Sequence, residues 1–250
     1  GITINGSNPW DIKVINPNFY NRVRTQGSLG LGESYMDGWW ECEKLDEFFY
    51  RILRFDMPSK IGLSLPVMVN FLSAKIFNLQ GVKRAFQVGE RHYDLGNDLF
   101  TKMLGENMTY SCGYWKDAND LDSAEEAKLD LICRKLNLQP GQRILDIGCG
   151  WGSFARHAAK NYGVSVVGVT ISKEQMKLAQ ELCQGLPVEF RLQDYRSLNE
   201  KFDHIISVGM IEHVGKKNYR TYMEVVKKCL KEDGLFLLHT IGSLKSGSNT

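Results

Sequence analysis

The chain has 250 residues, 43% hydrophobic and 24% charged, which are ordinary proportions for a globular protein of one large or two smaller domains. Its formal net charge of +2 argues against a nucleic-acid-binding protein but leaves room for a local basic patch that contacts anionic lipid. The sequence shows no apolar stretch of the roughly 18 residues that span a membrane, no signal peptide and no Cys-x-x-Cys pair, so we expect a cytoplasmic protein without a structural metal or disulfides.

Residues 1–85 predict a small N-terminal α+β domain, rich in aromatic residues, that contacts lipid or a second copy of the chain in a homodimer. Its last part, residues 66–86, is mostly apolar, with Lys75, Lys83 and Arg84 toward the end. Two interpretations remain open for this segment. It is a helix packed between two domains, or a membrane-proximal helix that contacts a lipid surface through its apolar and basic faces.

Residues 86–250 predict a parallel sheet. Five apolar runs alternate with helical segments, which is typical of strands covered on both faces. The runs are 143–150, 164–170, 188–194, 202–209 and 235–241. Ser123–Glu126 ("SAEE") predicts a capping box for a helix that stops at Pro140-Gly141, and Ser172–Gln175 ("SKEQ") predicts another for a helix that stops at Gly185.

A glycine turn follows the first run, in "LDIGCGWG", with Gly148, Gly150 and Gly152. Glycines let the backbone pass close to a ligand, and the following helix offers free N–H groups. A dinucleotide fingerprint would place the third glycine one residue later and an acid where Thr170 stands, so NAD is disfavoured. The pattern favours S-adenosylmethionine (SAM), with Asp146 near its sulfonium or amino end. A turn without a ligand is the alternative.

The ends of the second and third runs carry further candidates for cofactor binding. Gln193, Asp194 and Tyr195 follow the third run, where an amide or carboxylate can accept a hydrogen bond from an adenine amino group. Ser172 and Gln175 are candidates at the edge of the ligand, and they also have a purely structural role as helix caps.

Six segments taken in order resemble the cyclopropane-fatty-acyl-phospholipid synthases, SAM-dependent enzymes related to the cyclopropane synthases of mycolic acids. They are "HYDLGNDLF", "YSCGYW", "LDIGCGWG", "VVGVTISKEQ", "SVGMIEHVG" and "FLLHTIGS". The resemblance implies an α/β fold of the class I SAM-dependent methyltransferase (Rossmann-like) type, with strand order 3-2-1-4-5. It also implies a catalytic domain that is C-terminally incomplete after the fifth strand, so that a missing C-terminal segment or chain is expected.

The resemblance also implies which residues contact SAM. They are Tyr110 and Ser111, Gly148 and Gly150 beneath the cofactor, Thr170, Ser172 and Gln175 along its ribose, and Asp194 and Tyr195 near its adenine. In "HYDL", His92 and Asp94 either make loop hydrogen bonds or cover SAM, and Tyr93 is the residue of the three that we expect to reach the ligand.

A bicarbonate site beside the methyl group is implied in the same way. Its ligands would be Glu212, His239 and backbone groups near Cys112 and Ile241, with a tyrosine from a region outside this chain. Two alternatives compete with these roles: Glu212 and His213 are a helix-start acid and a surface histidine, or His239 is a hydrogen-bonded core residue.

The reaction itself limits what these residues do. After methyl transfer to an alkene, the lipid carries a positive charge that the rings of Tyr110, Tyr114 or Trp115 can stabilise. A base must then remove a proton to close the ring, and held bicarbonate avoids alkylation of a protein group. Cys112 is therefore expected to contribute its backbone and not a nucleophilic thiol.

These inferences together predict an enzyme that transfers a methylene group from SAM to the cis double bond of an unsaturated phospholipid acyl chain. We expect it at the inner face of the cytoplasmic membrane, in transient contact with the phospholipid surface and without a nucleic-acid partner. A SAM-dependent lipid C-methyltransferase that does not close a ring is the alternative enzyme. A lipid-binding module without catalysis is the third class.

Overall fold

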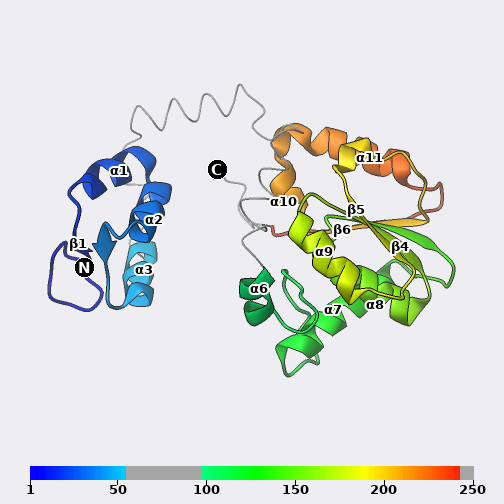
Figure 1. Cartoon of the computed structure of the whole chain (residues 1–250), viewed down its shortest axis with the longest axis horizontal. Coiled ribbons are helices and arrows are strands. Elements are labelled where there is room, and N and C mark those ends of the chain that lie inside the picture. Colours follow the sequence, from blue (N-terminus) through cyan, green and yellow to red (C-terminus); the bar gives the residue numbers. More distant parts are fainter. Residues whose placement is uncertain (55–96, 243–250) are drawn as a thin grey trace. The chain divides into compact units, whose positions relative to one another are not determined.

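The computed structural model describes residues 1–54 and 97–242 of the chain. The chain divides into two compact units, residues 1–78 and 79–250 (Figure 1). The boundary expected after residue 85, the segment 66–86 and the trio His92, Tyr93 and Asp94 lie outside the described residues and stay predictions. Within the described part, no helix has the length and apolar character needed to cross a membrane.

The described part of the first unit is built around Trp40. Helices α1 (Asn18–Gln26), α2 (Ser28–Met36) and α3 (Leu45–Arg54) accompany a short antiparallel pair, β1 (Lys13–Val14) and β2 (Trp40–Glu41). The Trp40 ring is buried against Phe19 and Phe48, and its Nε1 donates hydrogen bonds of 3.1 Å to Leu31 O and Ser34 Oγ. An aromatic α+β unit is therefore confirmed for this part of the chain.

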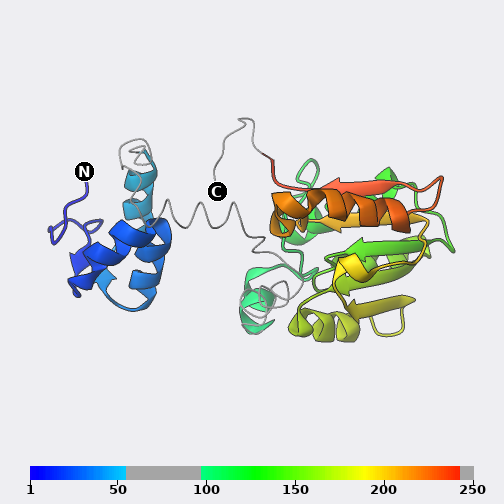
Figure 2. The ribbon, with the colours of Figure 1, turned by 90° about the horizontal axis from the view of Figure 1, so that it is seen from above.

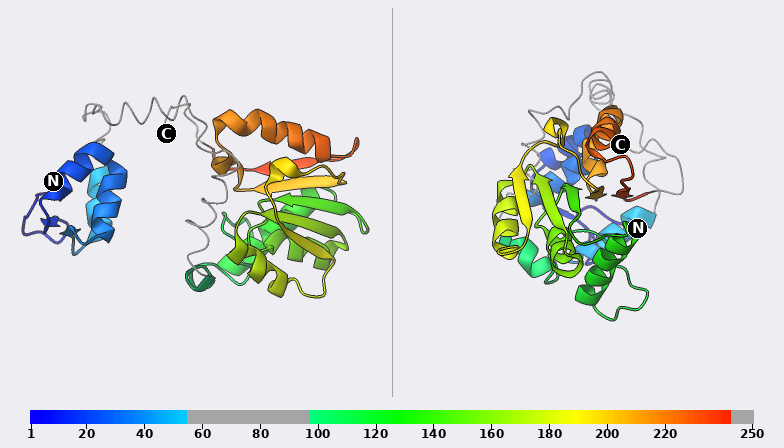
Figure 3. Two further views of the ribbon diagram at one scale, coloured as in Figure 1. Left: turned by 45° about the horizontal axis from the view of Figure 1, so that its top comes forward. Right: turned by 90° about the vertical axis from the view of Figure 1, so that its right-hand side faces the viewer.

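The second unit contains a five-stranded parallel sheet in the order β5-β4-β3-β6-β7 (Figures 2 and 3). The strands are β3 (Arg143–Ile147), β4 (Ser165–Thr170), β5 (Val188–Leu192), β6 (His204–Val208) and β7 (Phe236–His239). All five predicted strands and their order 3-2-1-4-5 are confirmed. Among the described residues, β7 pairs only with β6, so it forms one edge of the sheet (Figure 3).

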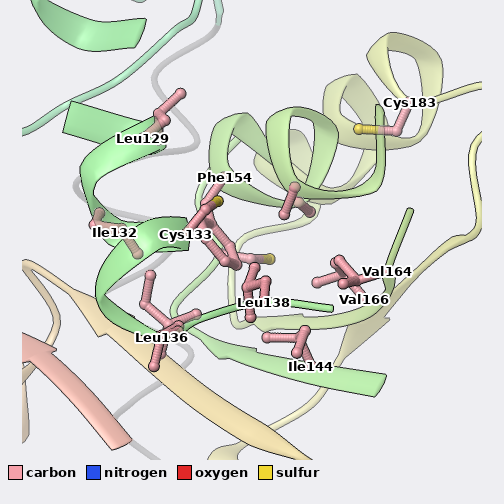
Figure 4. Close-up of a cluster of buried hydrophobic side chains, with 14 of the residues drawn as sticks. Leu129, Ile132, Cys133, Leu136, Leu138, Ile144, Phe154, Val164, Val166 and Cys183 are labelled. Atoms are coloured by element: carbon pink, nitrogen blue, oxygen red, sulfur yellow. The ribbon is translucent and has the colours of Figure 1, made fainter. Parts of the chain in front are cut away.

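Two layers of helices cover the sheet. Successive residues of each strand point to opposite faces, so the continuous apolar strands make both faces hydrophobic and both need a cover. On one face, α7 (Leu121–Lys135), α8 (Ser153–Tyr162) and α9 (Lys173–Leu182) enclose a cluster that includes Ile144 and Val166 (Figure 4). On the other, α10 (Ile211–Val214), α11 (Tyr219–Cys229) and the turn η2 (Tyr195–Ser197) pack on Leu145 and Val167.

The remaining described elements are short. Helix α6 (Asn97–Met103) places Phe100 against Trp151, with ring centroids 4.7 Å apart, and the turn η3 (Lys216–Asn218) precedes α11. Trp151 lies within the glycine turn, between Gly150 and Gly152, and its Nε1 donates to Asn97 Oδ1 at 2.9 Å. This contact ties α6 to the start of α8.

The ends of α7 differ from the prediction. Helix α7 begins at Leu121 with Asp120 as its N-cap, and Ser123 is the third helical residue, which completes the capping box with Asp120. The helix ends at Lys135, well before Pro140. Ser172 caps α9 as predicted, since its hydroxyl accepts the Gln175 N–H at 3.2 Å, but α9 ends at Leu182, ahead of Gly185.

Candidate active site

A cavity of about 200 Å³ lies where β3, β4, β5 and β6 end. The carboxyl ends of parallel strands are the usual place for a ligand in such a sheet, because the helices there begin with free N–H groups. The predicted cofactor residues that line it are Tyr110, Ser111, Asp146, Gly148, Gly150, Thr170, Gln175, Gln193, Asp194 and Tyr195. The structure therefore brings most of the predicted cofactor residues to one place.

The glycine turn forms the floor of this cavity. Gly148 and Gly150 have φ angles of +83° and +54°, which favour glycine, and the Gly148 N–H is held by Val169 O at 2.9 Å. A Cβ at Gly150 would meet no atom within 4 Å, so the backbone there faces open space that a ligand can occupy. Gly152 does not line the cavity: it is the N-cap of α8, and a Cβ there would lie 2.6 Å from Phe190 Cζ.

Asp146 is the acid at the end of β3. It is only 3% exposed, and burial raises the pKa of its carboxyl to about 7, although the nearby Lys128 ammonium acts in the opposite direction. The Thr170 hydroxyl, at the end of β4, donates to Gln175 Oε1 at 3.0 Å and accepts the Ser172 N–H at 3.2 Å. Ser172 itself does not line the cavity and acts as a cap.

The residues that follow β5 form another part of the cavity wall. Gln193 Nε2 donates to Ser197 Oγ at 3.0 Å, and Asp194 Oδ1 accepts the Arg196 N–H at 2.9 Å. The Tyr195 ring is buried edge-on against Tyr222, and burial raises the pKa of the Tyr195 hydroxyl. Asp194 and Gln193 therefore have part of their hydrogen-bonding capacity fixed by this turn.

Tyr110 and Ser111 lie on the loop before α7. Tyr110 is 59% exposed, with its ring edge-on to Phe100 at 5.6 Å between centroids. Ser111 Oγ accepts a hydrogen bond of 2.7 Å from Lys128 Nζ, and both residues line the cavity.

Cys112 and His239 lie together at the end of β7, with Cys112 Sγ 3.5 Å from His239 Nε2. The other ring nitrogen, Nδ1, is buried and has no hydrogen-bond partner among the described residues. Burial, with a smaller contribution from the Lys128 charge, lowers the pKa of His239, which favours the neutral imidazole. A neutral ring has one donor and one acceptor nitrogen.

Glu212 on α10 reaches the same strand end. Its Oε1 accepts the Ile241 N–H at 2.8 Å, while the Ile241 side chain is 85% exposed. Partial burial raises the pKa of Glu212, but hydrogen bonds from the Ile241 N–H and the Thr240 hydroxyl outweigh it and hold the pKa below its ordinary value. The residues predicted for an anion site thus meet in two contacts, Cys112 with His239 and Glu212 with Ile241.

Lys128 is a cavity residue that the sequence reasoning missed. It stands four residues after Ala124 and four before Ile132, both of which are buried on α7. A cation at that spacing, on the apolar face of a helix, is the signal that could have identified it. Met210 and His213, after β6, also line the cavity without having been predicted.

Comparison with known proteins gives the family. A family model described as Mycolic acid cyclopropane synthetase matches residues 80–250, which include every described residue of the cavity. The chain belongs to this family. The match starts at residue 80, before Cys112 and before the first strand of the sheet. All five strands and both contacts at the end of β7 therefore fall inside it.

Similar proteins of this family and fold agree with the architecture. The chain is 60% identical, over 249 residues, to the cyclopropane-fatty-acyl-phospholipid synthase of Escherichia coli (strain K12). The match covers all of this chain but only 65% of the length of that relative. A mycolic acid cyclopropane synthase, CmaA1 complexed with SAH and CTAB, is 38% identical with a TM-score of 0.59, over 61% of this chain and 55% of that one.

A coclaurine N-methyltransferase bound to N-methylheliamine and SAH is 28% identical with a TM-score of 0.62, over 76% of this chain and 58% of that one. The predicted methyltransferase fold is confirmed.

Proposed function

We propose that the protein transfers a methylene group from SAM to the cis double bond of an unsaturated phospholipid acyl chain. The products are a cyclopropane acyl chain and S-adenosylhomocysteine (SAH). Membership of the family and 60% identity to a cyclopropane-fatty-acyl-phospholipid synthase support this proposal. The observation that carries it is the pair of contacts at the end of β7, Cys112 with His239 and Glu212 with Ile241. These four residues do not line the cavity of the glycine turn, but their chain neighbours Ser111 and His213 do.

The residues of the cavity fit SAM. Open space over Gly150 leaves room for the ligand. Polar groups that follow β4 and β5, such as Gln175 and Asp194, can form hydrogen bonds with its ribose and adenine. Two solved structures of similar fold contain SAH, which supports the same ligand here. Bound SAM supplies an electrophilic methyl group, and the protein's task is to orient it and keep water away.

Exposed aromatic rings on the loop that contributes Tyr110 to the cavity suit the charge that develops on the lipid. Tyr110 lines the cavity, and Tyr114 and Trp115 follow it on the same loop with exposed rings. The face of an aromatic ring attracts a cation, and it has no lone-pair nucleophile that the cation would alkylate as readily as a thiolate or carboxylate. These rings therefore stabilise the positive charge without reacting with it.

Bicarbonate is the proposed base. Glu212 uses Oε1 for the Ile241 N–H, which leaves Oε2 to accept a hydrogen bond from the bicarbonate O–H. The neutral His239 ring can donate one N–H to a bicarbonate oxygen. Bound bicarbonate accepts the proton that is lost when the second carbon–carbon bond closes.

The proposed substrate determines the expected location of the protein. Phospholipid acyl chains lie in a bilayer, so the protein must contact a membrane surface at least transiently. We propose a peripheral location at the inner face of the cytoplasmic membrane, and a homodimer through the first unit.

The test is mass spectrometry of lipids from vesicles of an unsaturated phosphatidylethanolamine, incubated with the purified protein and SAM that carries a fully deuterated methyl group. A ring retains two of the deuterons because the third leaves in the closing step, and the product no longer contains a double bond. Rates are compared in buffer freed of carbon dioxide and in the same buffer with added bicarbonate. We expect the ring, with a strong dependence on bicarbonate.

Two outcomes would contradict the proposal. A product that keeps all three deuterons as a branched methyl group identifies a C-methyltransferase without ring closure. No product, together with SAH binding in a calorimeter, identifies a lipid-binding protein that has lost catalysis.

A further inference from the structure

Lys128 is a charged residue inside the protein. It is 5% exposed and lies on the face of α7 that also buries Leu129 and Ile132. Taking an ammonium ion out of water costs several kcal/mol unless an opposite charge or hydrogen bonds compensate. A lysine at this position therefore needs an explanation, because a leucine or methionine would fill the same space without that cost.

The hydrogen bonds of Lys128 leave its charge uncompensated. An ammonium group has three N–H donors, and the structure pairs it with the neutral Ser111 hydroxyl at 2.7 Å. None of the ion pairs among residues 1–54 and 97–242 includes Lys128. A hydroxyl cannot neutralise a cation, so this contact leaves Lys128 able to bind an anion.

No acid forms an ion pair with Lys128 in the part of the chain that the structure describes. Cys112, Glu125 and Asp146 act electrostatically on Lys128 from a distance. Burial raises the pKa of the two carboxyls, to about 7 for Asp146, which weakens the compensation that they give. Burial lowers the pKa of Lys128 to about 8, so the ammonium form still predominates at neutral pH. Because Lys128 and Ser111 both line the cavity, this charge faces the ligand.

We propose that Lys128 binds a carboxylate-type anion in the cavity, together with the Ser111 hydroxyl that it orients. Donation from Lys128 Nζ to Ser111 Oγ turns the hydroxyl hydrogen of Ser111 away from the ammonium, where it can donate to the same anion. Two anions of the proposed reaction carry this chemistry: the amino-acid carboxylate of SAM and bicarbonate. The inference rests on the proposed function, and its test separates the two sources.

The first arm measures binding of SAH and of methylthioadenosine by calorimetry. Methylthioadenosine has the same nucleoside and thioether but lacks the amino-acid carboxylate. The variants are Lys128→Met, which removes the charge, Lys128→Arg, which keeps it, and Lys160→Met, an exposed control on α8. If the anion is the SAM carboxylate, Lys128→Met lowers the affinity for SAH by about 10- to 100-fold and leaves the affinity for methylthioadenosine unchanged. Lys128→Arg then restores part of the lost affinity for SAH.

The second arm measures turnover against bicarbonate concentration. If the anion is bicarbonate, Lys128→Met leaves SAH binding unchanged and raises the bicarbonate concentration for half-maximal rate by about 10-fold or more. Thermal unfolding of each variant without ligand shows that the fold is intact. If Lys128→Met does not fold, the comparison between Lys128→Arg and Lys128→Gln takes its place.

Two results would overturn the inference. One is equal weakening of SAH and methylthioadenosine, which means that Lys128 only supports the packing of the cavity. The other is no change in SAH affinity or in bicarbonate dependence. Failure of the wild-type protein to bind SAH at all would instead count against the proposed function, so the two failures are distinguishable.

Discussion

Cys112 illustrates how a residue in an active site differs from a catalytic nucleophile. Its thiol lies 3.5 Å from His239 Nε2, an arrangement that resembles a cysteine–histidine pair. The proposed chemistry has no step in which a protein atom attacks, and a thiolate beside a cationic lipid would be alkylated. The contact is therefore a hydrogen bond that orients the His239 ring.

The first prediction compares these two residues. Cys112→Ser should keep activity within about 3-fold, because a hydroxyl still contacts His239, whereas His239→Ala should lose about 100-fold or more, because the base is no longer held. Initial rates on unsaturated vesicles measure both, and Cys42→Ser in the first unit is the control. Loss of activity in Cys112→Ser with normal SAH binding would restore the nucleophile interpretation.

The second prediction concerns Asp146 and pH. Burial raises its pKa to about 7, so between about pH 4 and pH 7 the folded protein binds a proton that the unfolded chain releases. Asp146 therefore contributes a loss of stability to the wild type as the pH rises through this window, and Asp146→Asn lacks this contribution. The stability of Asp146→Asn relative to wild type should be greater at pH 8 than at pH 5 by on the order of 2 kcal/mol.

Urea unfolding at the two pH values measures this difference. Asp233→Asn, at an exposed position in the turn before β7, is the control and should show no such change. A difference between wild type and Asp146→Asn that is independent of pH would mean that the Asp146 carboxyl titrates in its ordinary range.

At the scale of elements, β4 shapes the glycine turn through a position without a side chain. A Cβ at Gly168 would lie 2.9 Å from both Cys149 Sγ and Phe190 Cδ1, so only glycine leaves room for the turn above it. Gly168→Ala should lower the free energy of unfolding by about 1–3 kcal/mol through overpacking, and it should weaken SAH binding because the turn shifts.

Chemical unfolding and calorimetry test this expectation. Ser165→Ala, on the same strand, adds no atom and removes only a long hydrogen bond of 3.4 Å to Gln142 O, so it should change the free energy of unfolding by less than about 1 kcal/mol. Unchanged stability in Gly168→Ala would show that Cys149 and Phe190 can move aside.

The elements were predicted from sequence to the extent that their signals are local. All five strands were identified because a sheet covered on both faces requires continuous apolar runs, and the glycine turn was recognised because Gly148 and Gly150 need positive φ angles. The start of α7 was wrong because "DLDSAEE" contains two overlapping capping patterns. Only the observed hydrogen bond from Ser123 N to Asp120 Oδ1 distinguishes them.

The site was harder to predict where a residue's role depends on distant partners. Lys128 was missed because a lysine in a helix normally marks the solvent side, and its burial follows from the loop that carries Ser111. Gly152 was assigned to the cofactor on spacing alone, yet the structure places it against Phe190. Cys112 and His239 are 127 residues apart, and their contact needed the resemblance to a family to be expected at all.

At the scale of the molecule, one cavity gathers segments that are far apart in the chain. SAH should therefore slow amide hydrogen exchange in separate stretches, residues 146–151, 169–171, 193–196 and 208–210, because the ends of β3 to β6 all line the cavity. Residues 1–54, which do not line it, should exchange at the same rate with and without ligand.

Exchange measured by mass spectrometry gives this pattern directly, with adenosine alone as a control ligand that should protect the 193–196 stretch most. Protection confined to a single stretch, or spread over residues 1–54, would contradict the binding mode that the cavity implies.

The contact of Glu212 separates what holds the fold together from what the proposed reaction needs. One carboxylate oxygen fastens α10 to the end of β7 through the Ile241 N–H, and the carboxylate has further lone pairs for the proposed ligand. Glutamine preserves the first contact, since its amide oxygen accepts the same N–H, but it puts an N–H₂ group where an acceptor is needed. A chain with this substitution should keep its architecture while losing one of the proposed ligands of the base. A folded starting point for new methyl-transfer chemistry is therefore one nucleotide change away.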